Sequence, residues 1–143
     1  MAKRSSLSRL KGRRTTAPFL SLPSNILQSE EWAALTSFEV KMLVDLGAQY
    51  NGSNNGDLCA PWALMKARGW RSPGTLSKAL RGLQAAGFIE LTRQGGLHQC
   101  SLYALSWRGV DECKGKHDAK VSPVPSNTWK RQKQDRQSRG VSL

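Results

Sequence analysis

The sequence predicts a small α+β domain, because two kinds of periodicity follow one another along it. Apolar residues recur at helical spacing up to residue 86, and the chain after Gly87 alternates in the manner of β-strands. The order is helix, short strand, helix, turn, helix, strand, glycine turn and strand, which is typical of a winged helix-turn-helix. We expect this fold over residues 22–110, with a basic flexible arm at 1–21 and an extension and basic tail at 111–143.

The first elements precede the predicted helix-turn-helix. Residues 24–34 predict a short helix. Thr36 then begins T-S-F-E, the pattern of a capping box, which predicts a helix to residue 49 or 50 with Phe38 on its apolar face. The Asn and Gly residues of 50–57 predict a turn, and 58–59 predict a very short strand.

The next two helices form the predicted helix-turn-helix. Pro61 suits the first position of the helix P-W-A-L-M-K-A-R, and Gly69 suits the position just past its end. Ser72 as the N-cap and Pro73 in the first turn then predict a helix over 72–86. Two helices joined by so short a turn must cross sharply, which defines the motif.

The helix at 72–86 has one apolar face and one basic face. At about 100° per residue, Leu76, Leu80 and Leu83 fall on one side, and Lys78 and Arg81 fall on the other. A slim basic face of this kind can enter the major groove of DNA. Lys78 and Arg81 are the expected base contacts, Ser77 a flanking contact, and Arg71, Ser72 and Thr75 the expected phosphate contacts. The DNA-binding residues predicted in this region are Arg71, Ser72, Gly74, Thr75, Ser77, Lys78 and Arg81.

A β-hairpin, the predicted wing, follows this helix. The runs F-I-E-L-T-R and S-L-Y-A-L-S-W are β-rich, and Gly95 and Gly96 between them predict the hairpin turn. Arg93, at the start of the wing 93–98, is expected to lie along a phosphate backbone or to enter a minor groove.

Both ends of the chain are basic. The N-terminal K-G-R-R contains Arg13 and Arg14, which we expect to bind phosphate without sequence preference. Insertion of this segment into a narrow minor groove is the alternative. The C-terminal W-K-R-Q-K-Q-D-R-Q-S-R predicts either a salt-sensitive clamp on nucleic acid or a solubilising tail.

The net charge of +12 is unevenly distributed. Residues 58–110 contain seven Lys and Arg against one acid, whereas 24–57 contain five acids against one lysine. A surface of one sign attracts a polyanion, so double-stranded DNA is the expected partner. With three scattered cysteines, no secretory signal and no apolar run of bilayer length, the sequence predicts a cytoplasmic, nucleoid-associated protein that does not enter a membrane.

A metal site and catalysis were weighed against this interpretation. His98, Cys100, Cys113 and His117 are four ligands of a kind that zinc accepts, but no short Cys-x-Cys knuckle accompanies them. We therefore expect no metal and no cofactor. The sequence also contains no pair of acids, activated nucleophile or phosphate-binding loop at a catalytic spacing, which predicts a protein without enzymatic activity.

Several segments of this sequence resemble a family of small winged-helix proteins. These segments are Q-Y-N-G-S-N-N-G-D-L, R-G-W-R-S-P-G-T-L-S-K-A-L, A-A-G-F-I-E-L-T-R-Q-G-G and S-L-Y-A-L-S-W. The family is encoded in bacterial prophages and other mobile elements and is related to the DNA-binding domains of phage and plasmid replication initiators. The resemblance covers about residues 22–129, which implies that 111–129 pack back on the domain through Trp129. It implies DNA binding in general, without a target sequence.

The expected function is sequence-specific or semi-specific binding of double-stranded DNA. Transcription regulation and replication of a mobile element are the two roles that fit, and a homodimer fits either. The alternative is an adaptor or inhibitor that binds a host protein or nucleoprotein complex through the winged helix.

Overall fold

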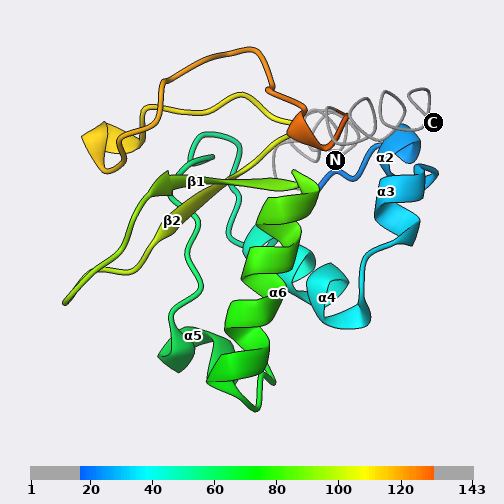
Figure 1. Ribbon diagram of the computed structural model, residues 1–143. Coiled ribbons are helices and arrows are strands. Elements are labelled where there is room, and N and C mark those ends of the chain that lie inside the picture. Colours follow the sequence, from blue (N-terminus) through cyan, green and yellow to red (C-terminus); the bar gives the residue numbers. More distant parts are fainter. Residues whose placement is uncertain (1–16, 131–143) are drawn as a thin grey trace, which may run out of the picture.

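The computed structural model describes residues 17–130, an α+β arrangement of helices packed against a hairpin (Figure 1). In this range the helices and strands are α2 (Ser24–Leu27), α3 (Glu30–Ala33), α4 (Ser37–Gly47), α5 (Trp62–Ala67), α6 (Pro73–Ala86), β1 (Ile89–Arg93), β2 (Leu102–Leu105) and the 3-10 turn η1 (Cys113–Gly115). The element order is compatible with a winged helix-turn-helix. No helix among residues 17–130 is both long and apolar enough to cross a bilayer.

The single helix predicted over 24–34 is wrong, because the structure contains two short helices, α2 and α3, in its place. Ser29 lies between them and its hydroxyl accepts a hydrogen bond from the Trp32 N–H at 3.1 Å. Because Ser29 caps α3 with a non-helical backbone, it cannot continue α2. Ile26, on α2, is fully buried in the core.

Helix α4 begins as predicted. Thr36 Oγ1 accepts from the Glu39 N–H at 3.1 Å, and Glu39 Oε1 accepts from the Thr36 N–H at 2.9 Å, which confirms the capping box. The helix ends at Gly47, earlier than predicted. Its end is set by a distant contact, because the Gln49 side chain exchanges hydrogen bonds of 2.7 and 3.0 Å with the backbone of Cys59.

The residues that end α5 and begin α6 are also largely as predicted. Pro61 immediately precedes α5 instead of occupying its first position, and Gly69 follows the helix with φ +98°. Ser72 caps α6, Pro73 is its first residue, and Gly87 ends it in the left-handed conformation. A Cβ atom on Gly87 would lie 2.7 Å from the backbone of Thr128, so no larger residue fits there.

Strands β1 and β2 pair antiparallel, with Ile89 opposite Leu105 and a register irregularity between Leu91 and Arg93. The short strand predicted at 58–59 is a single bridge, in which Leu58 and Tyr103 exchange hydrogen bonds of 3.2 and 2.7 Å. The predicted turn at Gly95 and Gly96 is wrong. Gly96 pairs with Gln99, so the two residues of the turn are 97–98.

The core lies between α4, α6 and the hairpin (Figure 1). Its fully buried large side chains come from α2, α4, α5, α6, the two strands and the segments beside them, and include Ile26, Met42, Leu43, Leu46, Leu58, Met65, Leu83, Phe88, Ile89 and Leu105. Phe38, predicted on the apolar face of α4, is instead 55% exposed. Its ring lies beside that of Trp70, with the ring centroids 5.8 Å apart.

Residues 111–130 pack on the domain. The Trp129 ring stacks on Phe88 with centroids 6.0 Å apart and is 4% exposed. The Asn127 N–H donates to the Ser106 carbonyl at 2.8 Å, and Thr128 Oγ1 donates to the Gly87 carbonyl at 2.7 Å.

The N-terminal boundary also lies earlier than residue 22. Leu20 packs against the core, and Trp107 Nε1 donates to the Ser21 carbonyl at 3.0 Å. Leu20 and Ser21 therefore contact the domain, although charge and composition assign them to the arm at 1–21.

Candidate nucleic-acid interface

Helix α6 presents the two faces that its sequence predicts. Leu76, Ala79 and Leu83 are buried against the core, and Leu80 packs at its edge. On the opposite side Gly74, Ser77, Lys78, Arg81 and Ala85 are exposed. The helical period alone places these two sets, because a 14-residue helix with one buried face must expose the other.

Most cations on α5, α6 and the turn between them have no partner in the described part of the chain, and Arg68, paired with Asp45, is the exception. Six Lys and Arg residues within 17–130 make no hydrogen bond, ion pair or ring contact with that part of the chain: Lys66, Arg71, Lys78, Arg81, Lys114 and Lys120. Four of these six described residues lie on α5, α6 or the turn between them. The structure therefore leaves positive charge available on this segment.

Asp45 fixes the turn that leads into α6. Its carboxylate, from α4, accepts from Trp70 Nε1 at 2.8 Å and from Arg68 Nε at 3.0 Å, and it pairs with Lys41 Nζ at 3.2 Å. Burial alone would raise the pKa of Asp45, but the hydrogen bonds from Trp70, Arg68 and Lys41 and the charge of Lys41 outweigh burial and lower it. The ionised carboxylate thus anchors Trp70 beneath the exposed Arg71.

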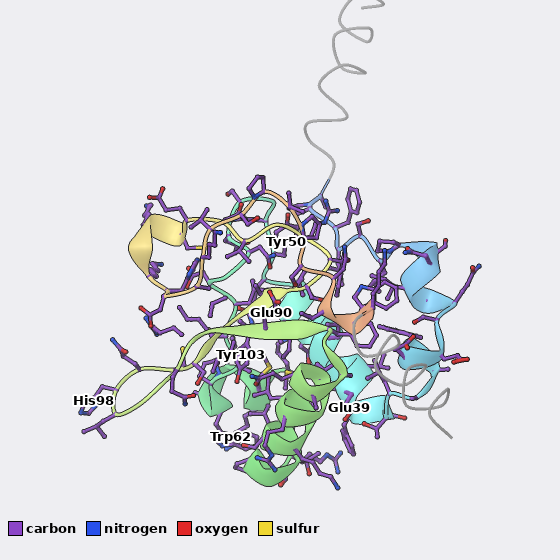
Figure 2. The ribbon with its side chains drawn as sticks, turned by 45° about the horizontal axis from the view of Figure 1, so that its top comes forward. Glu39, Tyr50, Trp62, Glu90, His98 and Tyr103 are labelled. Atoms are coloured by element: carbon purple, nitrogen blue, oxygen red, sulfur yellow. The ribbon has the colours of Figure 1, made fainter. Side chains whose placement is uncertain are left out.

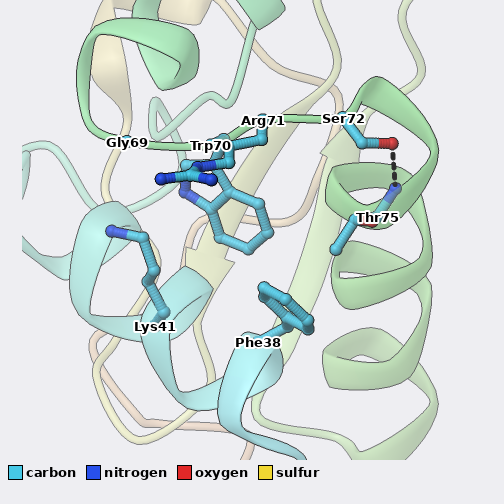
Figure 3. Close-up of a pocket in the computed structure, with 7 residues that line it drawn as sticks. All are labelled: Phe38, Lys41, Gly69, Trp70, Arg71, Ser72 and Thr75. Atoms are coloured by element: carbon cyan, nitrogen blue, oxygen red, sulfur yellow. Dashed lines mark hydrogen bonds between the residues drawn. The ribbon is translucent and has the colours of Figure 1, made fainter.

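Two of the predicted phosphate contacts also serve the fold. Ser72 Oγ accepts from the Thr75 N–H at 3.3 Å, the N-cap bond drawn in Figure 3. Both side chains are half-buried, whereas Arg71 beside them is exposed. The start of α6 is therefore held in place while a cation next to it stays accessible.

A hollow of about 280 Å³ lies beside this turn (Figure 3). Its lining residues are Phe38, Lys41, Gly69, Trp70, Arg71, Ser72 and Thr75. The Phe38 and Trp70 rings face each other with centroids 5.8 Å apart, and the Lys41 ammonium lies 5.7 Å from the centre of the Trp70 ring. Sequence analysis missed this feature, because the apolar period of α4 assigns Phe38 to the core.

The wing holds its predicted arginine in internal bonds. Arg93 Nη2 donates to the Cys100 carbonyl at 2.8 Å, and Nη1 donates to the Lys116 carbonyl at 3.3 Å. Arg93 therefore braces the base of the hairpin and joins it to the extension. A contact between Arg93 and DNA stays a prediction.

The four residues weighed as zinc ligands are not brought together. His98 is exposed at the tip of the hairpin, far from the body of the domain (Figure 2). His117 is buried with both ring nitrogens engaged: Nδ1 accepts from the Ala119 N–H at 3.1 Å, and Nε2 lies 2.6 Å from the Asp111 carbonyl. Among residues 17–130 no group of three or more His, Cys, Asp or Glu is placed to bind a metal.

Burial raises the pKa of two groups near the core, Cys59 and Tyr103. Burial, followed by the neighbouring Cys100 thiol, raises the pKa of Cys59 to about 11, so Cys59 is protonated at neutral pH and is a poor nucleophile. Burial also raises the pKa of Tyr103, which lies in the core on β2. Packing accounts for both residues.

Arg13 and Arg14 lie outside the described residues. Comparison with protein-family models, with curated proteins and with solved structures gave no match.

Proposed function

We propose that the domain is a winged helix-turn-helix that binds double-stranded DNA, with α6 in the major groove. The observation that carries the proposal is the set of unpartnered cations on α5, α6 and their turn. A cation paired inside the protein must break that contact before it binds phosphate, whereas Lys66, Arg71, Lys78 and Arg81 are free to bind at once.

The positions of these cations support different contacts with DNA. Lys78 and Arg81 lie on the outward face of α6, and Gly74 lies on the same face near the helix start. A residue as small as glycine lets the helix backbone approach base edges. Arg71 precedes the capped N-terminus, where phosphate is favoured by the helix dipole. Lys66, on the preceding helix, adds a second phosphate contact.

The test compares two double variants that remove the same charge. Lys78→Gln/Arg81→Gln removes two unpartnered cations from α6, and Lys114→Gln/Lys120→Gln removes two from the extension. We expect the α6 variant alone to weaken duplex binding strongly and to reduce the slope of log K against log salt by about two. Equal losses from both variants would indicate general attraction, and no loss from the α6 variant would refute the groove contact.

Selection of bound sequences from a random duplex pool then separates the roles in which this binding can serve. A palindromic site supports a homodimeric transcription regulator, and repeated sites support a role in replication of a mobile element. The proposal includes no cofactor and no catalytic step, and it locates the protein in the cytoplasm with the nucleoid.

An adaptor that binds a host protein is the second candidate, and the hollow beside Phe38 favours it. An exposed ring next to Trp70, with Lys41 and Arg71 at the rim, suits an apolar side chain that is flanked by acids. The adaptor predicts that Phe38→Ser abolishes a stable complex with a host protein on gel filtration, whereas the α6 variant retains that complex.

A further inference from the structure

The tip of the hairpin exposes an apolar side chain. Gly96 and Gln99 exchange backbone hydrogen bonds of 3.0 and 3.2 Å and close a turn whose two central residues are Leu97 and His98. Leu97 is 86% exposed, more than any other large hydrophobic side chain among residues 17–130. The large apolar side chain with the highest fractional exposure in the described part of the chain is therefore at the end of the hairpin.

The chemistry of the turn does not account for these two residues. Glycine, asparagine and aspartate are the residues that short hairpin turns favour. His98 instead adopts φ +65°, a left-handed conformation that is uncommon for a residue other than glycine. A lone exposed leucine on a helix needs no explanation, but a leucine followed by a strained residue at a projecting tip points to a contact outside the chain.

The hairpin behind Leu97 is braced, so the tip has a defined position. Arg93 donates to two backbone carbonyls, one of which belongs to the extension, at Lys116. The Gly95 N–H donates to Ser101 Oγ at 2.9 Å. In Figures 1 and 2 the tip projects away from the body of the domain.

The neighbours of Leu97 indicate what kind of surface it contacts. Residues 93–101 contain no acid, and Gln94, His98 and Gln99 beside the tip are exposed. Their side chains can donate hydrogen bonds, and an A·T-rich minor groove presents only acceptors at its floor. Apolar side chains such as leucine are known to enter that groove between base steps.

We propose that Leu97 is a wedge that enters the minor groove beside the site of α6, partly unstacks one base step and bends the duplex. This inference rests on the proposed function, because α6 must first bring the wing to DNA. Bending and unstacking distinguish a wedge from a residue that lies along phosphate.

The experiment measures bending separately from affinity. A duplex with a dye at each end reports bending by energy transfer, and a 2-aminopurine in an A·T-rich segment brightens when it unstacks. With wild-type protein we expect a bend of tens of degrees, about 20–90°, and brightening. Leu97→Ala should lose both signals with an affinity loss below about tenfold. Leu97→Phe, which keeps a large apolar side chain, should retain them.

The outcomes separate this inference from the proposal on which it rests. If Leu97→Ala binds and bends the duplex as wild type does, the wedge is refuted and binding by α6 stands. If wild-type protein binds duplex without bending it, the wedge is also refuted. If wild-type protein binds no duplex, both proposals fail. An unchanged bend together with loss of a protein complex in Leu97→Ala would assign the tip to a protein partner instead.

Discussion

Replacing Asp45 tests the anchor of the turn between α5 and α6. Asp45→Ala removes the acceptor of the buried Trp70 N–H, which costs about 1–3 kcal/mol when it is left unsatisfied. Lys41 and Arg68 are 40% and 43% exposed at their side chains, so each lost ion pair adds only about 0.5 kcal/mol. We expect the free energy of unfolding to fall by about 2–4 kcal/mol at neutral pH.

The pH dependence of the same variant gives an independent check. The pKa of Asp45 is lowered in the folded protein, so its contribution to stability is present above the unfolded pKa, about 3.9, and is lost as pH falls through the lower folded value. The difference between wild type and Asp45→Ala should therefore narrow below about pH 4.

Urea unfolding between pH 7 and pH 2.5, followed by tryptophan fluorescence, measures both effects. Asp45→Asn keeps an acceptor for Trp70 but loses the charge, so we expect its loss of stability to be smaller than that of Asp45→Ala. Glu112→Gln removes an exposed acid and serves as the control. Wild-type stability in Asp45→Ala at pH 7, or a difference that is constant with pH, would refute the anchoring role.

Two further substitutions test contacts that join distant parts of the chain. Asn55→Ala leaves the buried Leu105 N–H without the acceptor that now lies at 2.7 Å, and it should lower the free energy of unfolding by about 2–4 kcal/mol in urea. Trp129→Ala removes the ring stacked on Phe88 and should cost about 3–5 kcal/mol. A loss under about 1 kcal/mol in Trp129→Ala would show that the extension does not stabilise the domain.

The features that sequence analysis predicted correctly are local. Thr36 and Ser72 cap their helices because each hydroxyl needs only an N–H three residues later. Gly87 ends α6 with φ +85°, a left-handed conformation that glycine adopts readily at the end of a helix. No knowledge of the rest of the chain is needed to place such residues.

The errors concern contacts between distant residues. Phe38 has the helical spacing of a core residue, but it is exposed beside Trp70, a residue distant from it in the sequence. Residues 111–130 have no apolar period, and they are attached through Trp129 and through carbonyls at Gly87 and Ser106. Composition cannot count these specific bonds, and the expectation that 111–129 pack on the domain comes from the family resemblance.

The same reasoning applies to the candidate site, since residue type indicates the partner class and pairing determines which residues are available. Lys116 has the charge of Lys78, yet it pairs with Asp57, 59 residues away in the sequence, at 3.1 Å. Arg93 donates hydrogen bonds to the backbone carbonyls of Lys116 and Cys100. Net charge therefore overestimates the number of cations that are available to a polyanion.

If only the four unpartnered cations of α5, α6 and their turn bind phosphate, a fragment of residues 17–130 should show a slope of log K against log salt of about −4 on duplex DNA. The full chain should show a steeper slope, because residues 1–16 and 131–143 add further Lys and Arg, including Arg13 and Arg14. An equally steep slope in the fragment would mean that DNA displaces internal partners such as Asp57 from Lys116, and availability would then not be set by the free structure.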